Sequence, residues 1–156
     1  MSTSLTWSRL EDLEARALHA IAQLRVAVFV VEQRCAYAEI DDHDLEAWHL
    51  QVHIDGVLAA YARVLPPGRA YAEPAIGRVC TAAAFRGRGL GHVLVREAVR
   101  FTEGTYPGRG IRLAAQAHLQ PFYASAGFMA EGAVYEEDGI AHITMHRPAA
   151  TQVVQG

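Results

Sequence analysis

The residues with the clearest chemical potential form a glycine- and arginine-rich segment in the middle of the chain. Its sequence is Arg86-Gly87-Arg88-Gly89-Leu90-Gly91, and it lies between a predicted strand and a predicted helix. Glycines let the backbone approach a ligand closely, and the start of a helix offers unpaired N–H groups and a positive dipole end. With two arginines added, the segment is suited to binding a diphosphate. The simpler interpretation is a turn whose glycines serve only backbone geometry.

This segment departs from the fingerprint of dinucleotide-binding proteins. The pattern G-x-G-x-x-G needs a third glycine, but His92 stands three residues after Gly89. The segment also lies in the middle of the chain, after several other predicted strands. We therefore expect a diphosphate loop of another kind.

The composition excludes several classes of function. All fourteen basic residues are arginine, so there is no lysine for a Walker A loop, a Schiff base or a lysine general base. A formal net charge of -3 leaves no basic excess for binding nucleic acid. The chain is 51% hydrophobic but has no apolar run near the ~18 residues of a membrane span. These values predict a folded protein with neither nucleic-acid nor membrane partners.

The length predicts one domain. The 156 residues are enough for one hydrophobic core, over residues 1–148, with a flexible tail at 149–156. Cys35 and Cys80 lie too far apart for a C-x-x-C motif, and no disulfide scaffold is expected. The first ten residues lack the pattern of a secretory signal. We therefore expect a cytoplasmic protein.

Hydrophobic spacing predicts the elements that position these residues. Three- and four-residue steps indicate helices from Leu13 to Val31 and from Leu90 onward, and a short helix is expected over 119–125. Alternating or extended patterns predict strands at the following residues: 5–10, 50–53, 57–65, 75–81, 111–115, 128–135 and 142–147. The order β-α-β-β-β-α-β-α-β-β favours an α/β fold with a central mixed sheet flanked by helices.

Two blocks of this sequence resemble the GNAT superfamily of N-acetyltransferases. Arg86-x-x-Gly89-x-Gly91 after a strand is similar to that superfamily's acyl-CoA diphosphate loop. The segment from Gln116 to Phe128, with Phe122-Tyr123 and then Gly127-Phe128, resembles its N-x-x-A-x-x-F-Y-x-x-x-G-F block. Segments 29–33, 115–119 and 137–142 are similar to the ElaA-type branch, and the resemblance covers about residues 5–147.

The resemblance implies a GNAT-like acyltransferase fold, a donor and a set of binding residues. The implied donor is acetyl-CoA and the implied reaction is acetyl transfer to a primary amine. The residues that would bind CoA are Val79, Cys80, Thr81, Arg86, Gly87, Arg88, Gly89, Leu90, Gly91, Gln116 and Phe122. Three positions depart from the family pattern: Gln116 replaces asparagine, Leu119 replaces alanine, and Ala83 replaces a proline before the loop. Glutamine keeps an amide that can reach the pantetheine arm, so CoA binding is still expected.

The implied chemistry needs an oxyanion site, an acid and a base. Backbone N–H groups near residues 79–81 could donate to the thioester oxygen if that strand separates from its neighbour. Tyr123 is implied as the general acid for the leaving thiolate, and its alternative role is a core aromatic. Five residues could serve as the base for the amine: Glu32, His49, Glu136, Glu137 and His142. We favour His142, which shares a strand face with Thr144 and His146, opposite the apolar Ile143 and Met145.

An acidic connector over residues 39–46 is a candidate site for the acceptor. Glu39, Asp41, Asp42, Asp44 and Glu46 would attract a cationic amine, although a solvated acidic loop explains the same pattern. We predict that Glu32, Asp41, Asp44 and His49 contact a small-molecule or peptide amine.

Two other functions stay open. Arg25-x-x-x-Phe29 followed by Glu39-x-Asp41-x-x-Asp44 also resembles the N-terminal half of acyl-homoserine-lactone synthases. That resemblance would imply an acyl donor on a carrier protein. A CoA-binding sensor without catalysis is the other alternative, because a fold and a cofactor loop do not establish turnover. A homodimer is compatible with all three.

The sequence argues against a metal and against a covalent intermediate. The pairs His49 and His53, and His142 and His146, are four apart on predicted strands and so about 13 Å apart, too far to share one ion. Ala47 stands where a calcium loop needs glycine. The two cysteines form no C-x-x-C motif, and Ser125 is not in a nucleophile elbow. Direct attack by the amine is therefore expected.

Overall fold

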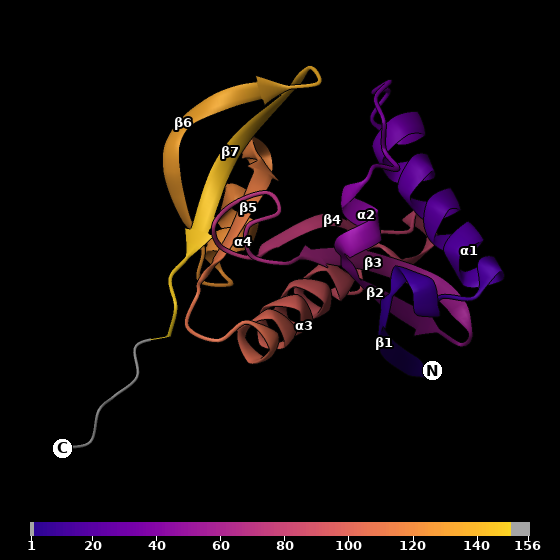
Figure 1. Cartoon of the computed structure of the whole chain (residues 1–156). Coiled ribbons are helices and arrows are strands. Elements are labelled where there is room, and N and C mark those ends of the chain that lie inside the picture. Colours follow the sequence, from indigo (N-terminus) through magenta and orange to yellow (C-terminus); the bar gives the residue numbers. More distant parts are fainter. Residues whose placement is uncertain (1, 151–156) are drawn as a thin grey trace.

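The computed structural model describes residues 2–150, which form a seven-stranded sheet with helices on both faces (Figure 1). The strand order across the sheet is β1-β2-β3-β4-β5-β7-β6. The strands are β1 (Thr3–Arg9), β2 (Trp48–Ile54), β3 (Val57–Leu65), β4 (Ala75–Thr81), β5 (Ile111–Gln116), β6 (Met129–Glu137) and β7 (Ile140–Arg147). All neighbours pair antiparallel except β4 and β5. The predicted order of elements and the mixed-sheet fold class are confirmed.

Four α-helices connect the strands. They are α1 (Ala15–Arg25), α2 (His43–Glu46), α3 (Leu90–Thr105) and α4 (Gln120–Ala124). The first helix covers its predicted length, but from Val26 to Glu32 it continues as a π-helix. Such wide turns are rare in proteins and are often found at functional sites. The short helix α2 lies inside the acidic connector, where the sequence pattern predicted none.

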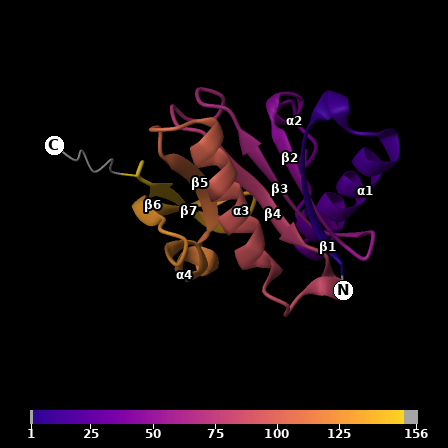
Figure 2. The same ribbon diagram turned by 90° about the horizontal axis from the view of Figure 1, so that it is seen from below.

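Strand β3 separates the two helical layers. Its residues alternate between the two faces, so Ala60 and Ala62 pack with Leu94 of α3 while Tyr61 packs with Ile21 of α1. Figure 2 shows α3 lying across the sheet on the face turned to the viewer. The central strands are therefore buried on both sides, which explains why β3 reads as a nearly continuous apolar run.

The sheet opens between β4 and β5. These two strands are parallel and pair only through Ala75 and Arg112, and no further ladder partners join them within the described chain. Beyond that pair β5 bonds to β7 on its other side along its whole length. The separation creates space inside the sheet next to the end of β4, which is the strand that leads into the glycine-rich loop.

Near the start of the chain a strand is formed, whereas the last described residues form no helix or strand. Strand β1 begins at Thr3, earlier than predicted, because it pairs with β2 over its whole length, from Thr3 with Ile54 to Arg9 with Trp48. In the expected tail, residues 149–150 belong to no helix or strand, and 151–156 lie outside the described residues. No helix between residues 2 and 150 is long and apolar enough to cross a membrane.

Candidate active site

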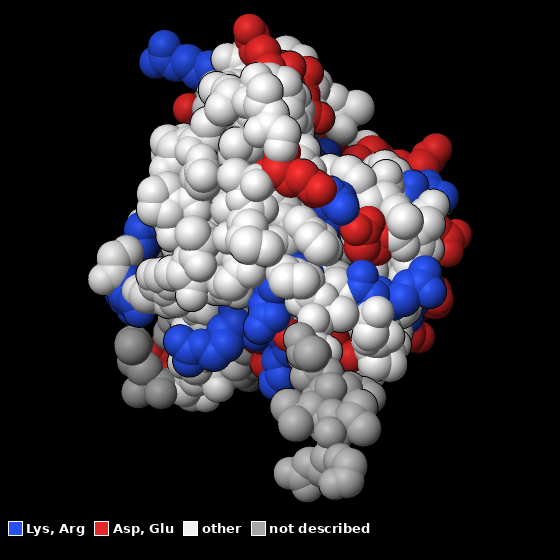
Figure 3. Space-filling model, turned by 90° about the vertical axis from the view of Figure 1, so that its left-hand side faces the viewer, with Lys and Arg blue, Asp and Glu red and all other residues white. Residues whose placement is uncertain are grey.

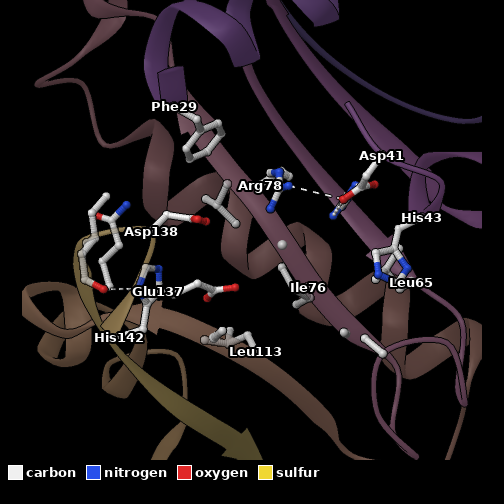
Figure 4. A pocket seen from close by; sticks show the side chains of 18 of the residues that line it. Phe29, Asp41, His43, Leu65, Ile76, Arg78, Leu113, Glu137, Asp138 and His142 are labelled. Atoms are coloured by element: carbon white, nitrogen blue, oxygen red, sulfur yellow. Dashed lines mark hydrogen bonds and ion pairs between the residues drawn. The ribbon is translucent and has the colours of Figure 1, made fainter. Parts of the chain in front are cut away.

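A cavity of about 380 Å³ lies where β4 and β5 separate. Its walls come from the end of the π-helix, the acidic connector, β4, β5, α4 and the β6–β7 hairpin. Figure 4 shows side chains from both sides of the sheet opening pointing into it. Five of the predicted site residues line this cavity: Val79, Gln116, Tyr123, His142 and Asp41.

Tyr123 brings a phenol to the cavity from α4. The side chain is buried and its ring packs edge-on against Phe122 and Phe128. Its hydroxyl hydrogen-bonds to no residue among those described, while the residue lines the cavity. Burial raises the pKa of Tyr123 to about 12, so the phenol is fully protonated at neutral pH. The Tyr123 phenol is therefore a protonated group on a residue that lines the cavity.

His142 and Gln116 are direct cross-strand partners on β7 and β5. The carbonyl oxygen of Ile140 lies 2.8 Å from His142 Nδ1 and can only accept, so Nδ1 carries the hydrogen. In the neutral ring Nε2 then keeps its lone pair and can accept a proton. Gln116 Nε2 donates to Gln33 Oε1 at 3.2 Å, which ties β5 to the end of the π-helix.

The end of β4 has an irregular backbone. Its pairing with β3 shifts register between Tyr61 and Arg63, and Arg78 on β4 adopts a left-handed conformation with φ of 53°. A left-handed conformation costs a residue other than glycine roughly 1–2 kcal/mol. Together with the lost pairing to β5, this bulge frees the β4 backbone around Val79 from a regular ladder.

The glycine-rich loop presents an open helix start. Gly87 and Gly89 have φ values of 79° and 77°, and Gly89 is the residue before α3. No side chain caps the first turn of α3, so its N–H groups are available to a ligand. The space beside both glycines is empty of protein atoms within 4 Å of where a Cβ would be. An open helix start next to the cavity strand fits the diphosphate of an acyl-CoA.

The rest of the loop makes contacts within the protein. Arg86 forms an ion pair with Glu32, and its Nε donates to the carbonyl oxygen of Thr81 at 3.2 Å. Phe122 packs against Gly91, where an added Cβ would lie 3.3 Å from the ring. Gly91 is therefore needed for the packing of α3 on α4. Glu32, predicted to contact the acceptor, instead joins the π-helix to the loop.

Gly89→Val is expected to weaken acyl-CoA binding by about tenfold or more, because the side chain would occupy the open space at the helix start. It should also lower the free energy of unfolding by about 1–2 kcal/mol, since valine is strained at this φ. Gly56→Val is the matched control, because Gly56 has φ of 81°, has empty space beside it and lies in the β2–β3 turn. Titration calorimetry showing equal affinity losses in both variants would remove the loop from the binding site.

The acidic connector is not an open negative rim, which corrects the prediction. Glu39 and Asp44 are buried. Arg25 Nη1 donates to Asp44 at 2.7 Å, and Arg63 Nη1 donates to Asp41 at 2.7 Å and to Asp44 at 2.9 Å. Charges removed from water must be paired, and here three arginines, including Arg78, neutralise three carboxylates. Asp44 therefore has no free oxygen surface for an amine, and only Asp41 borders the cavity.

His49 is a core residue and not part of the acceptor pocket, which is a second correction. The side chain is 1% exposed. Its Nε2 lies 3.0 Å from the carbonyl oxygen of Asp44 and must donate to it, so Nδ1 accepts from the Tyr61 hydroxyl at 2.6 Å. Both nitrogens are thus occupied, which excludes His49 as the base.

Burial lowers the pKa of His49 below its usual value, so folding disfavours its protonation. We expect the free energy of unfolding to fall on this account as the pH drops through about 6.5, because the unfolded chain binds the proton first. His49→Gln should show less of this fall in urea unfolding. His19→Gln, at an exposed helix position, should retain it. The same pH slope in all three proteins would contradict the assignment.

Several cavity residues were not predicted from the sequence. They are Gln33, Cys35, Tyr37, Arg63, Tyr71 and Arg78. Gln33 ends one of the segments that resemble the ElaA-type branch, and no motif marks the other five. Glu137, considered above as one of five bases, also lines the cavity.

Neither cysteine is placed as a nucleophile. Burial raises the pKa of Cys80 to about 12, and that thiol packs in the α1 core cluster. Cys35 lines the cavity, but its Sγ donates to the carbonyl oxygen of Asp138 at 2.9 Å. Among the described residues, no group of three or more His, Cys, Asp or Glu side chains could hold a metal ion.

Comparisons with known proteins agree with this geometry. The model of the acetyltransferase (GNAT) domain matches residues 17–148. An acyl-CoA N-acyltransferase from Pseudomonas aeruginosa is 44% identical, with a TM-score of 0.89 covering 94% of this chain and 99% of that one. Protein ElaA from Escherichia coli is 43% identical over 138 residues, 87% of this chain and 90% of that protein, and its crystal structure gives a TM-score of 0.87. The acyl-homoserine-lactone synthase LasI has a TM-score of 0.76 at 14% identity, which shows a shared fold only.

The fold and these similarities define an acyl-CoA-dependent acyltransferase. The chain belongs to the GNAT acetyltransferase family. Within that family it lies in the ElaA-type branch, as the three segments 29–33, 115–119 and 137–142 predict.

Proposed function

We propose that the protein is an N-acetyltransferase that moves acetyl from acetyl-CoA to a primary amine by direct attack. The observation that carries this proposal is the meeting of Tyr123 and His142 in one cavity, at the point where β4 and β5 separate. The glycine-rich loop and the open start of α3 follow directly from β4. Donor and acceptor can therefore occupy the two sides of the same opening.

Acyl-CoA binding would use the backbone more than side chains. The N–H groups at the start of α3, with Gly87 and Gly89, would hold the diphosphate. Gln116 would contact the pantetheine arm, and Val79 would lie beside the thioester. Backbone N–H groups from Val79 to Thr81 would donate to the oxygen as it becomes negative, because β5 does not use this edge of β4.

Bound acetyl-CoA supplies a thioester carbon to which the amine nitrogen bonds while the carbon–sulfur bond breaks. His142 Nε2 takes one proton from the incoming ammonium, since Nδ1 is fixed as the donor to Ile140. Tyr123 gives its phenolic proton to the departing sulfur. A thiol, with a pKa of about 8.5, is a stronger acid than the Tyr123 phenol, so the proton transfer creates a strongly basic phenolate. This phenolate then takes the second proton from the attacking nitrogen, which makes the overall transfer favourable. The products are an amide, a thiol and one proton passed by His142 to water.

The absence of an activated nucleophile among residues 2–150 supports a ternary complex without a covalent enzyme intermediate. The Cys80 thiol is buried and is not among the residues that line the cavity, and Cys35 donates its hydrogen to a carbonyl. A thiolate, not a thiol, is the nucleophile in cysteine enzymes. Neither side chain is held in that state.

Thermal unfolding with acetyl-CoA, and with NAD and ATP as controls, tests donor binding. At about a hundredfold excess over Kd, a ligand of the native state adds about 2.7 kcal/mol of stability. A rise with acetyl-CoA alone, followed by amine-dependent thiol release, supports the proposal. Stabilisation without thiol release for any amine would indicate a CoA-binding sensor. No stabilisation would direct the test to acyl-carrier protein as the donor.

A further inference from the structure

The two walls of the cavity offer different groups: one has arginine N–H donors that no described residue uses, and the other has carboxylates. Arg78 borders it from β4, and Glu137 and Asp138 border it from the β6–β7 hairpin. In Figure 4 both acidic side chains point from the hairpin toward the space beside Arg78 and Ile76. Acidic side chains also gather at the top of the face in Figure 3, where the turn of this hairpin lies in Figure 1.

The guanidinium of Arg78 has N–H donors that no described residue accepts. Its Nε donates to Glu39 Oε2 at 2.6 Å, and its Nη2 lies 3.4 Å from both the Glu39 carbonyl oxygen and Asp41 Oδ2. Its Nη1 donates to none of the residues described. The side chain is 23% exposed, and its guanidinium lies over the ring of Tyr37. The strained left-handed backbone at Arg78 is part of the bulge that turns this residue toward the cavity. Strain of this kind is often retained at binding sites.

The same wall has more donors than acceptors. Arg63 Nε is buried and has no partner among the described residues, and Gly77 beside it leaves room that a side chain would fill. Both oxygens of Asp41 already accept from arginines. No carboxylate on this wall is left to receive a second cation.

The wall formed by the β6–β7 hairpin offers a carboxylate that can accept hydrogen bonds. Glu137 is exposed and forms no ion pair with a described residue. It precedes the turn that returns the chain to His142, and Glu137 and Ile140 are cross-strand partners. A carboxylate beside a histidine with a free Nε2 is suited to holding an ammonium group while it loses a proton.

We propose that the acceptor is an amino carboxylate, with its amine held by Glu137 beside His142 and its carboxylate bound by Arg78. This inference rests on the proposed N-acetyltransferase function and names its substrate class. Diamines and polyamines are disfavoured because their second cation would meet the N–H donors of Arg78 and no carboxylate free to bind it.

Matched acceptors test the substrate class. The probes are ω-amino acids from glycine to 6-aminohexanoate, each compared with the n-alkylamine that has a methyl group in place of the carboxylate and with the diamine of equal length. Thiol release from acetyl-CoA gives kcat/KM for each. Calorimetry on the CoA-saturated protein gives the binding constants without turnover. At the best length the amino carboxylate is expected to exceed the alkylamine by about tenfold to a hundredfold, the range of a charge-assisted hydrogen bond.

Arg78→Asn should bring the ratio of amino-carboxylate to alkylamine constants close to one; the ratio is the readout because losing the contacts of Arg78 with Glu39 and Asp41 would affect both acceptors alike. Asparagine tolerates the left-handed backbone, so the variant removes the guanidinium without new strain. Arg78→Lys keeps the charge and should retain part of the preference. Arg100→Asn, at an exposed α3 position paired with Glu97, is the matched control and should keep all of it. Glu137→Gln should weaken both acceptors alike, since both carry the amine.

The outcomes separate this inference from the proposed function. The substrate class would be overturned if the unmodified protein had equal kcat/KM and binding constants for an amino carboxylate and its matched alkylamine, or if it preferred the diamine. This holds even if amines are acetylated. A carboxylate preference that survives in Arg78→Asn would overturn the role of Arg78. Binding of amino carboxylates that depends on Arg78, without thiol release from acetyl-CoA, would uphold the ligand class and reject the acetyltransferase proposal.

Discussion

Tyr123→Phe is expected to lower kcat for acetyl transfer by about a hundredfold or more, the usual contribution of a positioned general acid. The phenol faces the cavity and, with a pKa near 12, is protonated throughout the working range. Without it the sulfur must leave as a thiolate or take its proton from water. Acyl-CoA affinity should change little, because the ring that packs against Phe128 is kept.

The structure separates this effect from a loss of stability. The Tyr123 hydroxyl has no hydrogen-bond partner in the described part of the chain, so its removal breaks no bond within the protein. The melting temperature should therefore stay within a degree or two. Tyr106→Phe is the control, since Tyr106 packs at the edge of the same core cluster outside the cavity. Stopped-flow or steady-state thiol release that is equal for Tyr123→Phe and the unmodified protein would reject the acid role.

The largest effect on stability is expected for Asp44→Ala, which should lower the free energy of unfolding by about 3–5 kcal/mol. Asp44 Oδ1 accepts from both Arg25 and Arg63, and Arg25 is 2% exposed. Removing the carboxylate leaves two buried guanidinium groups without this partner. For a domain of this size the melting temperature should fall by roughly 10 °C.

Asp42→Ala is the matched control for Asp44→Ala. Asp42 is exposed, lies in the same connector and makes no side-chain cap to α2. Its replacement should change the free energy of unfolding by less than about 0.5 kcal/mol. If urea unfolding gave similar losses for both variants, the buried arginine cluster would not be a source of stability.

The pH dependence of Asp44 has a definite sign. Burial opposes its ionisation, but the hydrogen bonds and charges of Arg25 and Arg63 outweigh burial and hold its pKa below the ordinary value of 3.8. The carboxylate therefore contributes stability above about pH 3.8, and this contribution is lost as the pH falls through the lowered pKa. Asp44→Ala should accordingly flatten acid unfolding in this range.

Local sequence patterns were enough to predict most of the fold and the donor side of the candidate site. The spacing of Leu90, Leu94 and Ala98 predicts α3, and the Asp55-Gly56 turn predicts the β2–β3 hairpin, because both depend on neighbours within a few residues. The glycine loop and Tyr123 could be predicted for the same reason, since each lies in a short contiguous motif.

The acceptor side was decided only by the tertiary structure. The acidic connector reads as a negative surface because its five carboxylates are close in sequence, whereas their partners Arg25, Arg63 and Arg78 come from α1, β3 and β4. A charge pattern along the chain cannot show which ions are paired and buried, since pairing depends on distance in space and on the cost of leaving water. The packing of these elements turned an expected acidic rim into a neutral cluster. It also brought Arg78 and Glu137, far apart in the sequence, to opposite walls of one cavity.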